Sequence, residues 1–295
     1  MSKLAQFADY LQNERRYSKH TGTAYVNDVA QFFAFLQVQY SVADESVVKP
    51  AMVKSWIYEQ TQQKLSARSI NRKLVALNTF YKFLLRSGAV AINPMAAIQS
   101  VKTEKRLFQW LTETETNHLF DNEYIEFPDD FYGQRDKLIL ELLYGTGMRL
   151  SELISLQEKN INLAESCIKV TGKRNKERII PVPAQTAEAI HIYLQQKMLY
   201  GFTSTTLLVT DKGQPLYPMF VNRAVKKYIS MVSSIQKNSP HVLRHTYATH
   251  LLNNGAEINA IKELLGHANL AATQIYTHNS IERLKTIYKQ AHPKG

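Results

Sequence analysis

The chain has very little cysteine, no long apolar run and no excess of acidic charge. Cys167 is the single cysteine among 295 residues, so no intramolecular disulfide framework can form, and its strand-like surroundings predict a core position. No segment approaches the roughly 18 consecutive apolar residues of a membrane span, and the N-terminal segment has no apolar signal core. We therefore expect a soluble, cytoplasmic protein with no membrane partner.

Two further absences restrict the chemistry. The sequence has no P-loop pattern, and no cluster of carboxylates accompanies its conspicuous basic motifs. We therefore expect no ATP, no metal ion and no other cofactor. The charge that is present is basic, since 36 Lys and Arg face 25 Asp and Glu for a net charge of +11. Such a balance favours nucleic acid as the partner, although basicity can also serve solubility alone.

The first hundred residues predict a compact bundle of about four helices. Apolar residues recur at helical spacing, Ser18 and Thr21 are possible caps of the second helix, and the fourth helix starts near Ser66. Pro50 suits the first turn of the third helix, and Gly88 ends the fourth. We expect this helical domain to span residues 1–98.

The fourth helix of this bundle carries three basic residues that helical spacing places on one side. They are Arg68, Arg72 and Lys73. Such a row can reach phosphates along a DNA groove, and we expect it to bind DNA. The alternative is an ordinary solvated helix face.

The second half predicts helices around a small sheet. A polar, basic stretch at residues 99–106 reads as a linker, and a second domain at 107–295 follows. Within it, SCIKVTG and ERIIPVP predict a β-hairpin, and LLVTD (207–211) predicts a third strand. From about Tyr217 onward we expect helices with breaks near Ser239–Pro240, Gly255, Gly266 and Ser280. The fold class is therefore mainly α with a small β-sheet (α+β).

Six residues of the second half together form one chemical set. They are Arg149, Lys173, His241, Arg244, His267 and Tyr276. Guanidinium groups hold phosphate oxygens through a planar fork and do not lose their charge. A phenol beside such cations ionises more readily and can act as a nucleophile. The set is suited to holding a phosphodiester while the tyrosine oxygen attacks it.

The segments that carry these residues resemble a known family. GTGMRLSEL, TGKRNKERIIPV, HVLRHTYATHLL and LLGHANLAATQIYTH are similar to the catalytic domain of the tyrosine recombinases (integrases), most closely the Xer type. YSKHTGTAYVNDVAQFFAFL is similar to the core-binding domain of that family. The resemblance implies a C-shaped DNA clamp, made of an N-terminal core-binding bundle and a C-terminal catalytic domain.

The resemblance also implies a role for each member of the set. Arg149 and Arg244 would clamp the phosphate, His241 would hydrogen-bond it or assist proton movement, and His267 would support the pocket. Tyr276 would be the nucleophile that forms a 3′-phosphotyrosyl link and frees a 5′-hydroxyl.

Lys173 would be the general acid for the leaving 5′-oxygen, and Lys176 is the alternative acid. This sequence has Arg174 where the family commonly has glycine. Glu152 either orients Arg149 or is a plain surface carboxylate.

The implied activity is site-specific recombination of double-stranded DNA at a near-palindromic site through a Holliday junction. A homotetramer, or a heterotetramer with a paralogous recombinase, would act at synapsis, and activation by a DNA translocase stays open. Chromosome dimer resolution, which serves chromosome partition at cell division, is the expected role. Integration or excision of a mobile element, a type IB topoisomerase and a non-catalytic DNA-binding protein are the alternatives.

The C-terminal run SIERLKTIYKQAHPKG predicts an amphipathic helix whose apolar side includes Ile281, Leu284, Ile287 and Tyr288. The resemblance implies that it docks on a neighbouring protomer and couples active sites within the tetramer. The alternative is that it packs on its own domain.

Overall fold

A computed structural model of the chain describes residues 2–103, 109–172, 177–236, 238–266 and 278–293. Contacts divide the chain into two compact units, Met1–Arg106 and Leu107–Gly295. The unit boundary falls at the end of the stretch that the sequence marks as a linker. Each unit has its own hydrophobic core.

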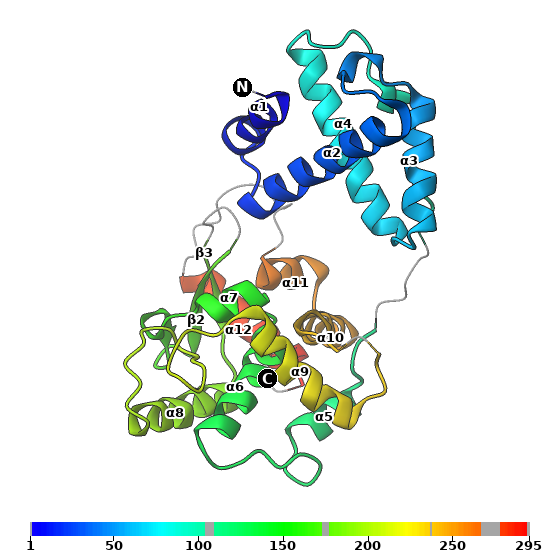
Figure 1. Cartoon of the computed structure of the whole chain (residues 1–295). Coiled ribbons are helices and arrows are strands. Elements are labelled where there is room, and N and C mark those ends of the chain that lie inside the picture. The colour runs from blue at the N-terminus through cyan, green and yellow to red at the C-terminus, as the bar shows by residue number, and fades with distance from the viewer. Residues whose placement is uncertain (1, 104–108, 173–176, 237, 267–277, 294–295) are drawn as a thin grey trace. The chain divides into compact units, whose positions relative to one another are not determined.

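The first unit is a helical bundle (Figure 1). Its helices are α1 (Lys3–Asp9), which continues into a π-helical turn (Tyr10–Glu14), α2 (Lys19–Tyr40), α3 (Pro50–Gln62) and α4 (Ala67–Arg86). The Ser18 and Ser66 side chains accept hydrogen bonds from the backbone three residues on, and Pro50 opens α3. Of the two possible caps of α2, Ser18 has this role, and the predicted start of α4 near Ser66 is confirmed.

The structure corrects the predicted basic row on α4. Arg68 and Arg72 are exposed, but the Lys73 side chain is buried, with 5% of the residue accessible. The Lys73 ammonium donates to Gln31 and, at 3.4 Å, to Asp28, while Trp56 packs over it at 5.5 Å. Lys73 therefore does not share the exposed side, and it pairs, together with Arg72, with the buried Asp28 carboxylate.

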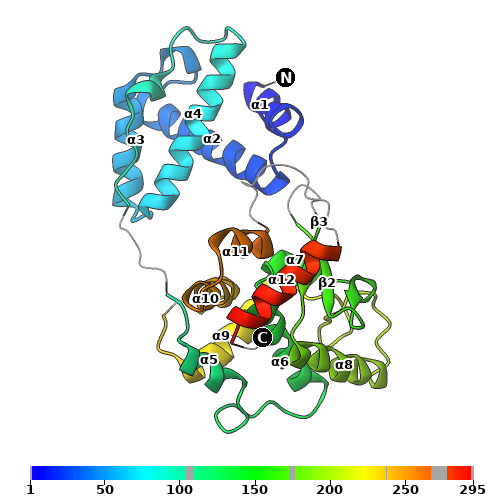
Figure 2. The ribbon, with the colours of Figure 1, turned by 180° about the vertical axis from the view of Figure 1, so that it is seen from behind.

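The second unit is mostly helical. Its helices are α5 (Glu113–Phe120), α6 (Phe131–Thr146), α7 (Leu150–Ser155), α8 (Ala184–Leu199), α9 (Pro218–Val232), α10 (Pro240–Asn253), α11 (Ile258–Leu265) and α12 (His278–Ala291). Helix α6 is central, since α7, α8, α9 and α10 all pack on it. Figure 2 shows α12 on the opposite side of this unit from the view of Figure 1.

A three-stranded antiparallel sheet completes the second unit. Strands β2 (Cys167–Thr171) and β3 (Glu177–Pro181) form the predicted hairpin, and β1 (Ile161–Asn162) pairs with β2. The prediction of a strand at 207–211 is wrong. Side chains take backbone groups of this run: the Lys197 ammonium donates to the Leu207 carbonyl oxygen at 3.3 Å, and the Tyr193 hydroxyl accepts from the Val209 N–H at 3.2 Å. The run is therefore a loop with an isolated bridge.

The helix breaks of the second unit fall mostly where glycine or proline was expected. Ser239 precedes α10, and Gly255 and Gly266 both have positive φ. The break expected near Ser280 is wrong, because α12 runs through this residue.

The described part of α12 packs in its own unit, as one of the two alternatives expected. Tyr288 and Ala291 are buried in the core of the second unit, and the helix contacts β3, α10 and α11. In the part of the chain that the structure describes, no helix has the length and apolar character needed to cross a membrane.

Candidate active site

Arg149 stands between two helices in the second unit. Helix α6 ends at Gly147, whose φ of +58° is the left-handed geometry of a helix C-cap, and α7 begins directly after Arg149. The Arg149 backbone N–H donates to Glu152 Oε2 at 2.7 Å, and its Nη1 donates to Oε1 at 2.8 Å. Glu152 is 2% exposed, so it is a buried partner that orients Arg149 and not a surface carboxylate.

A third arginine, which the sequence motifs did not single out, shares this carboxylate. Arg178 in β3 is 4% exposed, and its two Nη atoms donate to Glu152 at 2.6 and 2.8 Å. Its strand position gave one signal, since Arg178 and Ile180 lie on the same face of β3 and both are buried. A charged residue on the core face of a strand predicts a buried ion pair.

The carboxyl group of Glu152 is held ionised by these neighbours. Burial by itself would raise its pKa, but hydrogen bonds and charge from Arg178, followed by those from Arg149, lower the pKa to about 2. Glu152 is thus a permanent anion at neutral pH.

Arg244 lies in α10, one turn after His241. Its Nη1 donates to the Gly147 carbonyl oxygen at 2.6 Å and its Nη2 to that of Leu265 at 2.7 Å. Burial, together with the charges of Arg149 and Arg178, lowers the pKa of Arg244 to about 10. The guanidinium therefore stays charged at neutral pH while lying close to two other cations.

The three arginines meet at the C-terminal end of α11. Arg178 Nε donates to the Leu264 carbonyl at 3.0 Å, Arg244 to that of Leu265, and Arg149 Nη2 to that of Gly266 at 3.0 Å. The last carbonyls of a helix lack intrahelical partners and carry the negative end of its dipole, so they attract cations. Three consecutive carbonyls thus place three guanidinium groups side by side; we call them the arginine cluster.

The histidines of α10 divide into two kinds. His241 is exposed in the first turn of the helix, where it is open to a ligand. His250 is buried, with Nδ1 3.0 Å from the Tyr144 hydroxyl and Nε2 2.9 Å from the Leu111 carbonyl oxygen. His250 has the structural role expected of a core histidine.

Three residues of the predicted set lie outside the described part of the chain. They are Lys173, His267 and Tyr276, and Lys176 and Arg174 lie outside it as well. The described neighbours are informative: Gly172 follows β2, Gly266 bears the carbonyl that Arg149 binds, and α12 begins two residues after Tyr276. Of the six residues, the structure brings Arg149 and Arg244 together and places His241 one helical turn from Arg244.

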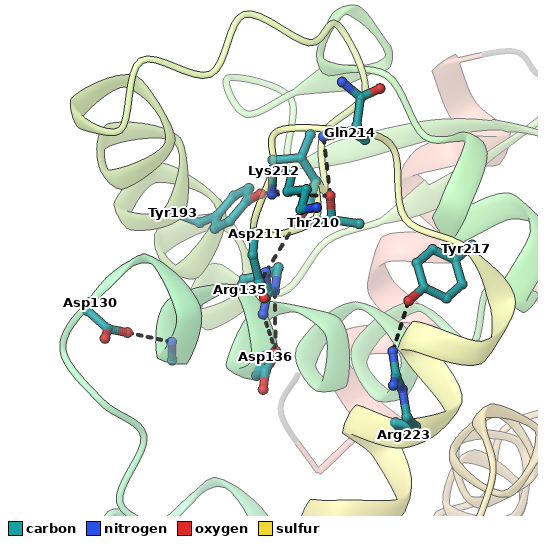
Figure 3. Close-up of polar contacts among 12 residues, drawn as sticks. Asp130, Arg135, Asp136, Tyr193, Thr210, Asp211, Lys212, Gln214, Tyr217 and Arg223 are labelled. Atoms are coloured by element: carbon teal, nitrogen blue, oxygen red, sulfur yellow. Dashed lines mark hydrogen bonds and ion pairs between the residues drawn. The ribbon is translucent and has the colours of Figure 1, made fainter.

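The arginine cluster has more positive charge than its own carboxylate can neutralise. Glu152 pairs with Arg149 and Arg178, and the three guanidinium groups together with this carboxylate carry a net charge of +2 (three minus one). Arg135, another buried arginine of this unit, differs because both Asp136 and Asp211 pair with it (Figure 3). Within the described ranges, no three His, Cys, Asp or Glu side chains are grouped as metal ligands would be. The arginine cluster is therefore suited to an oxyanion such as a phosphodiester.

Family models match both units. The model of the phage integrase family matches residues 109–283, and that of the phage integrase N-terminal SAM-like domain matches residues 4–88. The chain therefore belongs to the phage integrase family, the tyrosine recombinases, and is of the Xer type.

Individual relatives are similar over nearly their whole length. The chain is 36% identical to tyrosine recombinase XerC of Chlorobaculum tepidum, across 99% of this chain and 94% of the relative. It is 38% identical to tyrosine recombinase XerC of Listeria innocua, across 98% and 97%.

Solved structures share the fold. XerH site-specific recombinase bound to palindromic difH substrate, in a post-cleavage complex, superposes with a TM-score of 0.72 at 22% identity, covering 96% of this chain and 83% of that one. The Tn1549 transposon integrase in complex with circular intermediate DNA gives 0.71 at 20% identity, covering 95% and 98%.

Proposed function

We propose that the chain is a site-specific DNA recombinase that cleaves and rejoins DNA through a covalent tyrosine intermediate. The observation that carries this proposal is the arginine cluster, in which Arg149 and Arg244 lie together with a single carboxylate among three guanidinium groups. A scissile phosphodiester supplies the missing negative charge. The family membership and the XerC relatives support the same function.

In the proposed reaction the Tyr276 oxygen attacks the phosphorus and the bond to the 5′-oxygen breaks. Lys173 gives a proton to that leaving oxygen, so the products are a 3′-phosphotyrosyl ester and a free 5′-hydroxyl. One ester replaces another, and therefore rejoining by a 5′-hydroxyl needs no ATP. The step likewise uses no metal ion, since guanidinium groups stabilise the developing charge.

The arginines act because charge on the phosphate oxygens grows in the transition state. Partly buried hydrogen-bond donors that are already in position before the reaction lower the activation barrier of cleavage. Loss of one such donor reduces the rate about 100- to 1000-fold. His241 adds a hydrogen bond or assists proton movement from its exposed position. His267 completes the pocket.

We further propose that the two units grip a duplex as a C-shaped clamp. Arg68 and Arg72 on α4 would lie near phosphates. Four protomers, identical or mixed with a paralogous recombinase, would synapse two near-palindromic sites and proceed through a Holliday junction. The full-length likeness to XerC proteins favours chromosome dimer resolution over mobile-element integration. The proposal includes activation of the recombinase by a DNA translocase.

The decisive experiment tests for the covalent intermediate. A duplex selected from a random library for tight binding is nicked beside the scissile position, so that cleavage releases a short strand and rejoining fails. Wild type, Tyr276→Phe and the control Tyr124→Phe, which alters an exposed tyrosine of the same unit, are incubated with it in EDTA and run on a denaturing gel.

We expect a covalent protein–DNA band for wild type and for Tyr124→Phe, and none for Tyr276→Phe. A band that persists in Tyr276→Phe would assign the nucleophile elsewhere. The absence of any band, on DNA that all three proteins bind, would favour a non-catalytic DNA-binding protein.

A further inference from the structure

Arg178 is the arginine of the cluster that faces inward. With 4% of its surface accessible, it is more buried than Arg149, whose side chain is 33% exposed. Its hydrogen bonds to described residues are two to the Glu152 carboxylate and one to the Leu264 carbonyl. It therefore reaches neither solvent nor substrate, and any effect on the reaction passes through its neighbours.

The bonds of Arg178 lead to both arginines that are proposed to hold the phosphate. Through Glu152 it is connected to Arg149, because Oε1 accepts from Nη1 of both guanidinium groups, at 2.6 and 2.8 Å. Through Leu264 it fixes the carbonyl that precedes the one bound by Arg244. One side chain thus ties β3, α7 and the end of α11 together.

The backbone at Gly266, at the end of α11, lies close against the Arg178 side chain. Gly266 has a φ of +65°, and a Cβ atom at that position would lie 3.0 Å from Arg178 Cδ. Gly266 thus ends α11 directly over the arginine stem, and its carbonyl accepts from Arg149 Nη2. Arg178 also lies five residues after Lys173 in the sequence.

We propose that Arg178 is a positioning residue for DNA cleavage: it sets Arg149 through Glu152 and Arg244 through the end of α11. The inference rests on the proposed recombinase function and assigns to it a residue outside the set of six. If the Arg178–Glu152 ion pair only stabilised the fold, its replacement would leave the cleavage rate unchanged, since buried ion pairs can be replaced without loss of function.

The test is a double-mutant cycle on the cleavage rate. Arg178→Lys keeps a positive charge but cannot bind both Glu152 oxygens and the Leu264 carbonyl in the same fork geometry. Its single-turnover rate on the nicked duplex, at saturating protein, is compared with wild type, Arg149→Lys, Arg244→Lys and the two double variants. Thermal unfolding and DNA affinity are measured on each protein.

We expect Arg178→Lys to cleave about 10- to 100-fold more slowly than wild type, as for other residues that orient a reacting group. In the Arg149→Lys and Arg244→Lys backgrounds the same change should cost much less, since the residues act as one unit. The matched control is Arg135→Lys, another arginine with 4% exposure in the same unit. It should lower stability, leave the cleavage rate near wild type, and combine additively with Arg149→Lys.

A wild-type rate in Arg178→Lys, or a loss that is fully additive with both other arginines, would overturn the inference. If Arg178→Lys fails to fold, Glu152→Gln combined with Arg178→Met removes both buried charges together and leaves neither unpaired. That variant should fold and still cleave at least tenfold more slowly, and a wild-type rate in it would equally refute the positioning role. The proposed function fails separately, since then wild type itself would give no covalent product.

Discussion

Glu152 is the carboxylate that partly neutralises the charge of the arginine cluster. It is buried, it is shared by two guanidinium groups, and its pKa lies far below the usual 4.5, at about 2. A carboxyl group with a lowered folded-state pKa stabilises the fold at all pH values above its unfolded pKa. That stabilisation is lost as pH falls through the folded pKa.

This predicts an acid-dependent difference between wild type and Glu152→Gln. Above pH 5 the ionised carboxylate should make wild type more stable by about 3 kcal/mol, from the size of the shift. Between about pH 5 and pH 2 the difference should shrink, because protonated Glu152 resembles glutamine. Urea unfolding of both proteins across this range measures it, and a difference independent of pH would contradict the ion-pair account.

For single residues, the sequence predicts those roles that depend on neighbours close in the chain. Ser18 and Ser66 accept hydrogen bonds from backbone atoms three residues away, so the starts of α2 and α4 could be predicted from the local sequence. Lys73 pairs with Asp28 and Arg178 with Glu152, across 45 and 26 residues, and only the folded chain brings such partners together. Arg149 and Arg244 were predicted because their motifs are family-specific, although the neighbouring carbonyls at the end of α11 that anchor them were not.

The end of α6 shows how one helix terminus serves a second element. Gly147 closes α6 in the left-handed conformation, and its carbonyl accepts from Arg244. A Cβ atom there would lie 2.5 Å from the ring of Tyr247, which sits one turn after Arg244 in α10. The close approach of α6 and α10 at this point needs glycine.

Gly147→Ala should therefore destabilise the second unit by more than the strain of a positive φ alone. Gly255→Ala is the matched control, since Gly255 has a φ of +86° and nothing within 4 Å of the added atom. We expect a loss of about 1 kcal/mol for Gly255→Ala and clearly more for Gly147→Ala, by urea unfolding. Equal losses would mean that Tyr247 moves aside freely.

Elements were predicted well where local signals agree with tertiary packing. The β2–β3 hairpin and most helices of the second unit fit their patterns of apolar residues. The run at 207–211 has strand-like residues, but the buried Lys197 binds the Leu207 carbonyl and the Tyr193 hydroxyl binds the Val209 N–H. Propensity cannot reveal such a competitor for hydrogen bonds.

On the scale of the whole molecule, a net charge of +11 predicts that DNA binding weakens steeply with salt. The exposed and the buried basic residues of α4 should differ in their effect on this salt dependence. Arg68→Gln should reduce the slope of log K against log salt by about 1, as expected for the loss of one phosphate contact. Lys73→Gln should leave the slope unchanged and lower the thermal stability, because Lys73 is paired inside the bundle.

Titrations of labelled duplex at several salt concentrations provide the slopes. A reduced slope for Lys73→Gln, in a protein that is still folded, would mean that the ammonium leaves its partner for DNA. An unchanged slope for Arg68→Gln would remove the exposed side of α4 from the proposed interface.

The two separate cores also bear on how such a chain can change over generations. Phe7, Trp56 and Phe80 belong to one core, while the buried residues around the arginine cluster, such as Leu264 and Tyr247, belong to the other. Substitutions far apart with no shared partners combine additively, so selection can alter the packing of one half without loosening the other. The core of the first unit can therefore diverge among descendants while the second unit, which contains the arginine cluster, is inherited unchanged.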